Sequence, residues 1–214
     1  MNREGLPTVV GLALFSLLVG WSGLAYNFIF MTILAGITLV LMLFSIYFFR
    51  DPRRTPPEQS NCVVSPADGK VIAIDDFREN DFIEGDSKRV AIFLSLFNVH
   101  VNYVPFKGVV DFVRFQRGSN VRADLPEAST HNVNILTGLE TTHGKLAFKQ
   151  STGMVARRLV NYLRLGDKVE TGQKFGIIKF GSRMEVYLPT HADVKVSLGD
   201  RVRAGETIIA EFHD

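Results

Sequence analysis

Cysteine is almost absent from this chain, which has one residue of this type, Cys62, among 214. A single cysteine cannot form an internal disulfide, and it cannot supply a cysteine-based metal cluster. We therefore expect a protein of a reducing compartment, without a metal site. The net charge is only +2, and no nucleic-acid partner is expected.

Charge is also absent from a long N-terminal stretch, because residues 5–49 contain no Asp, Glu, Lys or Arg. This stretch far exceeds the ~20 residues needed for one membrane crossing and predicts two helices. We expect the first at residues 6–20, extended by a few residues, and the second at 28–49. Polar residues, glycine and aromatics at 21–27 indicate the break between them. The first segment is short, so a re-entrant or interfacial helix is the alternative.

Positive charges flank this apolar stretch at both outer ends. Arg3 precedes it, and Arg50, Arg53 and Arg54 follow it, which predicts that both ends lie in the cytoplasm. We therefore predict a membrane-anchoring helical hairpin at residues 1–49. A soluble, mainly β (α+β) domain at 50–214 should follow on the cytoplasmic face of the cell membrane.

Several strands are expected in the soluble domain. Residues 63–74 read as strand, turn and strand, because Pro-Ala-Asp-Gly is a turn pattern in which Asp68 caps and the glycine accepts unusual backbone angles. A buried strand at 90–95 leads into residues 98–103, where Asn98, His100 and Asn102 alternate with apolar residues and share one face. That face either meets solvent or lines a cleft. Residues 118–134 are expected to form a loop, and 152–162 a helix.

The C-terminal part repeats a pattern of Leu-Gly-Asp, a basic residue, Val, two residues and Gly. The first copy begins at Leu165 and the second at Leu198. Such turn-and-strand units predict a compact β-sandwich of short hairpins, and the pattern resembles lipoyl and biotinyl carrier domains. A carrier would need a modifiable lysine at a hairpin tip, commonly in a Met-Lys-Met-like triplet, and the sequence has none there.

Gly181 and Ser182 lie between the two repeats instead, flanked by apolar and β-branched residues that indicate a strand interrupted at this pair. A glycine leaves its carbonyl sterically open, so the hydroxyl of Ser182 can reach the carbonyl carbon of Gly181. This is the geometry that an intramolecular N→O acyl shift requires. The alternative is a β-bulge with an exposed serine, which a two-residue pattern cannot exclude.

Three motifs together resemble the phosphatidylserine decarboxylase family, most closely its short prokaryotic form with an N-terminal membrane hairpin. In chain order they are Ser-Pro-Ala-Asp-Gly at 65–69, Phe-Leu-Ser at 93–95 followed by Asn-Val-His-Val-Asn at 98–102, and Phe-Gly-Ile-Ile-Lys-Phe-Gly-Ser-Arg at 175–183. The resemblance covers essentially the whole chain, and the joint match is far more specific than any single motif.

The resemblance implies a proenzyme that cuts itself. Ser182 would attack the Gly181 carbonyl, and elimination would leave a pyruvoyl group in place of Ser182. The products would be a β subunit of residues 1–181 and an α subunit of residues 182–214, held together as a heterodimer or in a higher oligomer. The pyruvoyl group would replace any external cofactor: it would form a Schiff base with phosphatidylserine and accept the electrons released on decarboxylation to phosphatidylethanolamine.

The family also implies roles for individual residues. Its members use an Asp, a His and the Ser for self-cleavage, and Asp68 matches the Asp. Longer bacterial members carry two His three residues apart and use the second for cleavage, whereas this chain has His100 at the first position and Tyr103 at the second. We therefore predict His100 as the base, with His191 as the alternative.

A phospholipid substrate needs cations for its phosphate. The candidates are Arg157, Arg158, Lys179 and Arg183, and Asn102, on the strand face of His100, is a further candidate for substrate binding. For each cation the alternative is solvated surface charge near anionic lipid.

Two other functions remain compatible with the sequence. One is a non-enzymatic, membrane-anchored lipoyl-like adaptor or carrier. The other is decarboxylation of a different serine-headed lipid, such as archaetidylserine, because the head group is shared.

Overall fold

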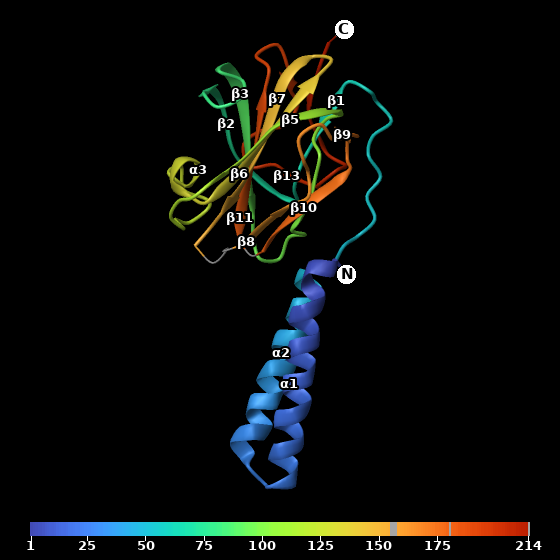
Figure 1. The fold of residues 1–214 in the computed structure, drawn as a ribbon, viewed down its shortest axis with the longest axis vertical. Coiled ribbons are helices and arrows are strands. Elements are labelled where there is room, and N and C mark those ends of the chain that lie inside the picture. Colours follow the sequence, from blue (N-terminus) through green and yellow to red (C-terminus); the bar gives the residue numbers. More distant parts are fainter. Residues whose placement is uncertain (155–157, 180, 214) are drawn as a thin grey trace. The chain divides into compact units, whose positions relative to one another are not determined.

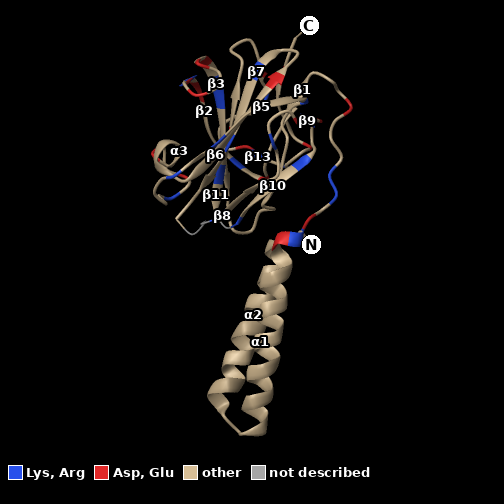
Figure 2. Cartoon of the chain, in the orientation of Figure 1, with Lys and Arg blue, Asp and Glu red and all other residues tan. Residues whose placement is uncertain are grey.

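The computed structural model describes residues 1–154, 158–179 and 181–213 and divides into two units, Met1–Pro52 and Arg53–Asp214. The N-terminal unit is a hairpin of α1 (Leu6–Ala25), preceded by the short 3-10 turn η1 (Arg3–Gly5), and α2 (Ile29–Phe48) (Figure 1). Neither α1 nor α2 carries a charged residue (Figure 2), and both are long and apolar enough to cross a membrane.

The predicted hairpin is confirmed, and the first helix extends beyond residue 20, as expected. It continues to Ala25, through residues 21–25 that were assigned to the break. Gly23 allows α2 to pack closely against this part of the helix, because a Cβ at this position would lie 2.7 Å from Thr32 Oγ1. The connection is a turn at residues 26–28, where Asn27 adopts a left-handed φ of 51°.

The second unit is built almost entirely from antiparallel strands (Figure 1). Their bounds are β1 (Cys62–Val64), β2 (Gly69–Glu79), β3 (Gly85–Leu94), β4 (Val101–Tyr103), β5 (Gly108–Gln116), β6 (Asn134–Thr141), β7 (Gly144–Thr152), β8 (Arg158–Asn161), β9 (Lys168–Val169), β10 (Lys174–Lys179), β11 (Ser182–Leu188), β12 (Asp193–Val194), β13 (Arg201–Val202) and β14 (Ile208–Glu211). One short helix, α3 (Ala128–His131), occurs in the described part of this unit.

Three sheets enclose the core. The large sheet has the order β13-β2-β3-β11-β7-β6-β5-β9, and two small sheets have the orders β1-β14-β12 and β4-β10-β8. Apolar side chains from all three form one buried cluster, in which Ile92, Met184 and Phe148 of the large sheet meet Ile209 and Phe175 of the small ones. The mainly β fold predicted from the sequence is confirmed.

The two C-terminal repeats adopt the same local structure at opposite edges of the large sheet. Gly166 and its equivalent Gly199 have φ values of +85° and +97°, a region that suits glycine. Asp167 and Asp200 each accept a hydrogen bond of 2.8 Å from the backbone nitrogen three residues earlier. The following strands, β9 and β13, then pair with β5 and β2 at the two ends of the sheet.

The helix expected at residues 152–162 is wrong in the part that the structure describes. Residues 155–157 lie outside the described part, and residues 158–161 form β8, which pairs with β10. Leu159 and Val160 suit a strand as well as a helix, and the neighbouring strand decides between them. The expected loop at 118–134 contains the short helix α3.

Candidate active site

Ser182 begins β11, a strand in the interior of the large sheet. β11 pairs with β3 on one side and with β7 on the other, and Ser182 lies opposite Leu94 and Thr152. Directly opposite residues share a face of an antiparallel sheet, and here that face also carries Ile92 and Met184 of the core cluster. The Ser182 side chain is fully buried, so the exposed serine considered above is wrong.

His100 lies beside this serine. Its Nδ1 atom is 3.5 Å from Ser182 Oγ, and its Nε2 atom is 3.0 Å from the carbonyl oxygen of Ser95. A carbonyl oxygen can only accept a hydrogen bond, so Nε2 must carry the proton of a neutral ring. Nδ1 is then left with a lone pair facing the Ser182 hydroxyl, which is the arrangement of a general base and its nucleophile.

Asn98 and Asn102, the other two polar residues of this segment, make different contacts. Asn98 Oδ1 accepts hydrogen bonds from the backbone nitrogen and hydroxyl of Ser95, which fixes the turn whose carbonyl contacts His100. Asn102 is fully buried and accepts a hydrogen bond of 2.9 Å from Gln150 Nε2. The shared face predicted for these residues lines the protein interior at Asn102 and His100, where both are inaccessible to solvent.

The Gly181 carbonyl also has a close neighbour. A Cβ atom added to Gly153 would lie only 2.5 Å from the Gly181 oxygen, a distance at which one of the two backbones would have to move. Glycine at position 153 therefore permits the observed position of the carbonyl that would be attacked. Gly181 and Gly153 also line a hollow of about 300 Å³ together with Arg122 and Asp124.

Asp68 and Tyr103 are both in the neighbourhood of the second repeat. The carboxylate of Asp68 accepts hydrogen bonds of 2.9 Å from Arg54 and 2.8 Å from the Ala204 nitrogen. The ring of Tyr103 packs against Gly205, where an added Cβ would lie 3.0 Å from it. His100 Nε2 thus contacts the Ser95 carbonyl oxygen, and a role of Asp68 in cleavage stays a prediction.

The remaining predicted residues are spread over the domain. His191 is exposed and packs against Phe212. Arg158 is exposed on β8, Lys179 is half-buried at the end of β10, and Arg157 lies outside the described residues. Arg183 is 2% exposed, and its guanidinium contacts Glu185 at 2.7 Å and 2.8 Å. This pairing does not support Arg183 as a ligand of a lipid phosphate.

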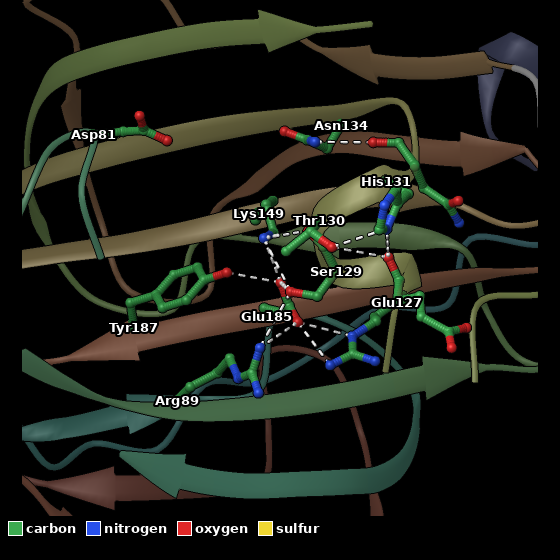
Figure 3. A network of polar contacts seen from close by, with 12 residues as sticks. Asp81, Arg89, Glu127, Ser129, Thr130, His131, Asn134, Lys149, Glu185 and Tyr187 are labelled. Atoms are coloured by element: carbon green, nitrogen blue, oxygen red, sulfur yellow. Dashed lines mark hydrogen bonds and ion pairs between the residues drawn. The ribbon is translucent and has the colours of Figure 1, made fainter. Parts of the chain in front are cut away.

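Glu185 is the centre of a buried ionic cluster (Figure 3). It lies on the face of β11 opposite to Ser182, because successive residues of a strand alternate between the two faces. Its carboxylate accepts hydrogen bonds from Arg183, from Lys149 at 2.7 Å, from Tyr187 at 2.7 Å and from Ser129 at 3.0 Å. Burial alone would raise the pKa of Glu185, but the charges of Lys149 and Arg183 outweigh it and lower this pKa to about 2. The carboxylate is therefore ionised at neutral pH.

This cluster connects β11 to the segment that precedes β6. Arg183, the residue after Ser182, also donates to the Leu125 carbonyl at 3.2 Å, and Ser129 belongs to α3. Sequence reasoning missed Glu185, Lys149 and Gly153. Charged residues alternating with apolar ones along β11 resemble a solvated strand face, and only the pairing of β11 with β3 and β7 shows that this face is covered.

Comparisons with known proteins show the family to which this chain belongs. The family model described as phosphatidylserine decarboxylase matches residues 41–210, which include Ser182, His100 and both repeats. The chain belongs to the phosphatidylserine decarboxylase family. It is also 42% identical over 211 residues to the phosphatidylserine decarboxylase proenzyme of Desulfotalea psychrophila, covering 98% of this chain and 95% of that protein.

The relative is named a proenzyme, and a serine that faces a buried imidazole beside an accessible glycine carbonyl is suited to self-cleavage. The near-complete coverage of the relative extends the likeness to the N-terminal hairpin, which lies mostly outside the residues matched by the family model.

Proposed function

We propose that this protein is a self-processing, pyruvoyl-dependent decarboxylase that converts phosphatidylserine to phosphatidylethanolamine. The observation that carries the proposal is the pairing of His100 Nδ1 with Ser182 Oγ in a chain of this family. The same contact does not favour an adaptor or carrier, which would have no use for a buried serine and base.

Self-cleavage begins with a proton transfer within the chain. His100 Nδ1 takes the Ser182 hydroxyl proton while Oγ bonds to the Gly181 carbonyl carbon. The Gly181–Ser182 C–N bond then breaks, its nitrogen gains a proton, and an ester joins the two residues. A positioned base contributes roughly 10²–10⁴-fold to such a step, and the Ser95 carbonyl holds the ring in the tautomer required.

Elimination completes the cut. Loss of the Ser182 Cα proton expels the Gly181 carboxylate and leaves a dehydroalanine, whose imine form takes up water and releases ammonia. The residues present fit the resulting group, because Cα, Cβ and the carbonyl carbon of Ser182 supply its three carbon atoms and Gly153 leaves space beside the Gly181 carbonyl. The pyruvoyl group would supply a carbonyl that binds the substrate amine and accepts the electrons of the departing carboxylate.

The remaining residues of the site would orient the bound head group and exclude water. His100 and Asn102 are closed off from bulk water on the core side, which keeps the reacting ester from hydrolysis in competition with elimination. The amide pair of Asn102 and Gln150 places further polar atoms on the core side, where they can orient a bound head group.

The apolar hairpin would keep the enzyme with its substrate. Its two helices suit insertion in a bilayer, and the arginines at both outer ends favour the cytoplasmic side for both ends. The soluble domain would then remain at the cytoplasmic face of the cell membrane, where a lipid head group can enter without leaving the bilayer completely.

Intact-mass measurement of the purified protein tests the proposal. We expect two fragments, residues 1–181 and residues 182–214, with the smaller one carrying a ketone in place of its N-terminal amine. Ser182→Ala should leave one uncut chain without decarboxylase activity, while the control Ser197→Ala, an exposed serine of the same fragment, should be cut normally. An active protein that retains an unmodified Ser182 contradicts the mechanism.

A further inference from the structure

A basic hollow lies on the outer side of the large sheet, separate from the Glu185 cluster. It has a volume of about 510 Å³ and is lined by Lys70, Arg201 and Arg203, with Phe93 and Phe97 on its apolar side. All three cationic side chains are exposed. Concave sites with a few convergent charges among apolar groups are typical of small-molecule binding.

The positive charge of this hollow is not compensated. Within the part of the chain that the structure describes, Lys70, Arg201 and Arg203 form no ion pair. The one acidic residue in the lining is Asp68, and its carboxylate is already engaged by Arg54 at 2.9 Å. Cations that converge on one hollow without acidic partners favour an anionic ligand, above all a phosphate.

The strand register brings these cations towards the cleavage site. Arg201 lies opposite Lys70, Lys70 lies opposite Phe93, and Phe93 lies opposite Arg183. Because neighbouring strands are about 4.8 Å apart, the Lys70 backbone is roughly 10 Å from that of Arg183, the residue after Ser182. Phe93 also lines the smaller hollow that contains Gly181, so one side chain borders both.

Apolar side chains stand beside the cations. Phe97 is 67% exposed and Leu96 37% exposed, although both follow a buried strand. Exposed apolar groups next to a basic hollow match a ligand with an anionic head and an apolar tail.

We propose that this basic hollow binds the phosphate of the glycerophospholipid substrate, with Phe97 and Leu96 against its glycerol and acyl part. The inference rests on the proposed function and names a site for the substrate's phosphate that is distinct from Arg158, Lys179 and Arg183. In a serine-headed phospholipid only a few bonds separate the phosphate from the reacting amine. Lys70 and Phe93 share the sheet face of Arg183, opposite to the core-facing side chain of Ser182. The amine of a lipid whose phosphate is held by Lys70 would therefore pass Phe93 at the end of β11 to reach position 182.

The test uses the full-length protein in phosphatidylcholine vesicles that contain phosphatidylserine. The variant K70Q/R201Q/R203Q should be cut into its two fragments like the unaltered protein. Its KM for phosphatidylserine should rise by about tenfold or more, with kcat within about twofold, because the lost contacts hold substrate equally in the ground and transition states. The matched control R164Q/K168Q/K107Q removes three charges around the first repeat, in which Lys168 is the equivalent of Arg201, and should not change KM.

A short-chain, water-soluble phosphatidylserine separates head-group binding from attraction to an anionic surface. The proposal requires KM to rise for this substrate as well. A rise for vesicles alone, or for neither substrate, overturns it. Competition by inorganic phosphate that is as strong as that by glycerophosphoserine would assign the hollow to free phosphate instead. If the triple variant is not cut, the single variant R201Q is measured in its place. If the unaltered protein itself is uncut or inactive, the proposed function is refuted, and not only this phosphate site.

Discussion

His100 combines two contacts that set its chemistry: the Ser95 carbonyl fixes the proton on Nε2, and Nδ1 faces Ser182 Oγ. No carboxylate is needed to choose this tautomer. We expect His100→Ala to slow self-cleavage by roughly 10²–10⁴-fold, the usual contribution of a positioned base. The measurement is the fraction of cut chain over time by intact mass. His131→Ala, which changes an exposed histidine, is the control, and equal rates for the two variants would exclude His100 as the base.

Gly153 offers a second test at the residue scale. Gly153→Ala places a methyl group 2.5 Å from the Gly181 oxygen and must displace that carbonyl, so we expect the cut to be slower by at least about tenfold, since small misplacements of reacting atoms cost up to 10²-fold. The control is Gly85→Ala, where the nearest atom is 3.8 Å from the new Cβ. Similar rates of cutting for Gly153→Ala and the unaltered chain would contradict the role given to Gly153.

The sequence predicted the central pair of this site but not its surroundings. Ser182 was singled out because an accessible glycine carbonyl precedes it, whereas the role of His100 as its base came from the resemblance to the family. The carbonyl partner of His100 could not be predicted, since it depends on a turn that Asn98 closes. Arg183 was expected at a phosphate, because a single sequence does not reveal that Glu185 lies within reach of the same side chain.

At the scale of elements, β11 carries opposite chemistries on its two faces. Ser182 and Met184 face the core, whereas Arg183, Glu185 and Tyr187 form the ionic cluster (Figure 3). Removing one partner of a buried ion pair leaves the other charge uncompensated, at a cost of about 3–5 kcal/mol.

We therefore expect Glu185→Gln to lower the denaturation midpoint of the uncut Ser182→Ala chain in detergent.

The pH dependence of this stability follows from the lowered pKa of Glu185, about 2 against 4.5 as the usual value. The ionised carboxylate stabilises the folded state fully above about pH 4.5, and this stabilisation is lost as pH falls towards 2. Unfolding midpoints measured from pH 5 to 2 should fall less steeply in Glu185→Gln than in its parent. The control Glu170→Gln changes an exposed residue and should keep the parent's slope; a Glu185→Gln slope equal to it would contradict the assignment.

Local patterns predicted some elements correctly and failed for others. The repeated Gly-Asp turns determine their own geometry, since Asp167 and Asp200 make the same contact to the backbone. Residues 158–161 have no such internal signal. Their strand conformation depends on β10, which supplies the pairing partners, and periodicity alone favoured a helix there.

At the scale of the whole molecule, the proposed cut would fall at the start of an interior strand. β11 pairs with β3 and β7 along most of its length, and β13 and β14 of the same fragment pair with β2 and β1. The two fragments should therefore stay associated after cleavage. We expect one species of full mass under native conditions and two fragments in denaturant. Elution of residues 182–214 as a free peptide under native conditions would contradict this.

The pairing of β11 on both sides has a consequence for the mature enzyme's durability. A new N-terminus is ordinarily frayed and accessible to exopeptidases. The N-terminus at position 182 would instead begin inside a sheet, without a free amine and without an unpaired segment before the strand. Aminopeptidases would find neither the free amine that they recognise nor an unpaired segment of chain to bind. The pyruvoyl group at position 182 would thus be protected from exopeptidases for as long as the domain stays folded.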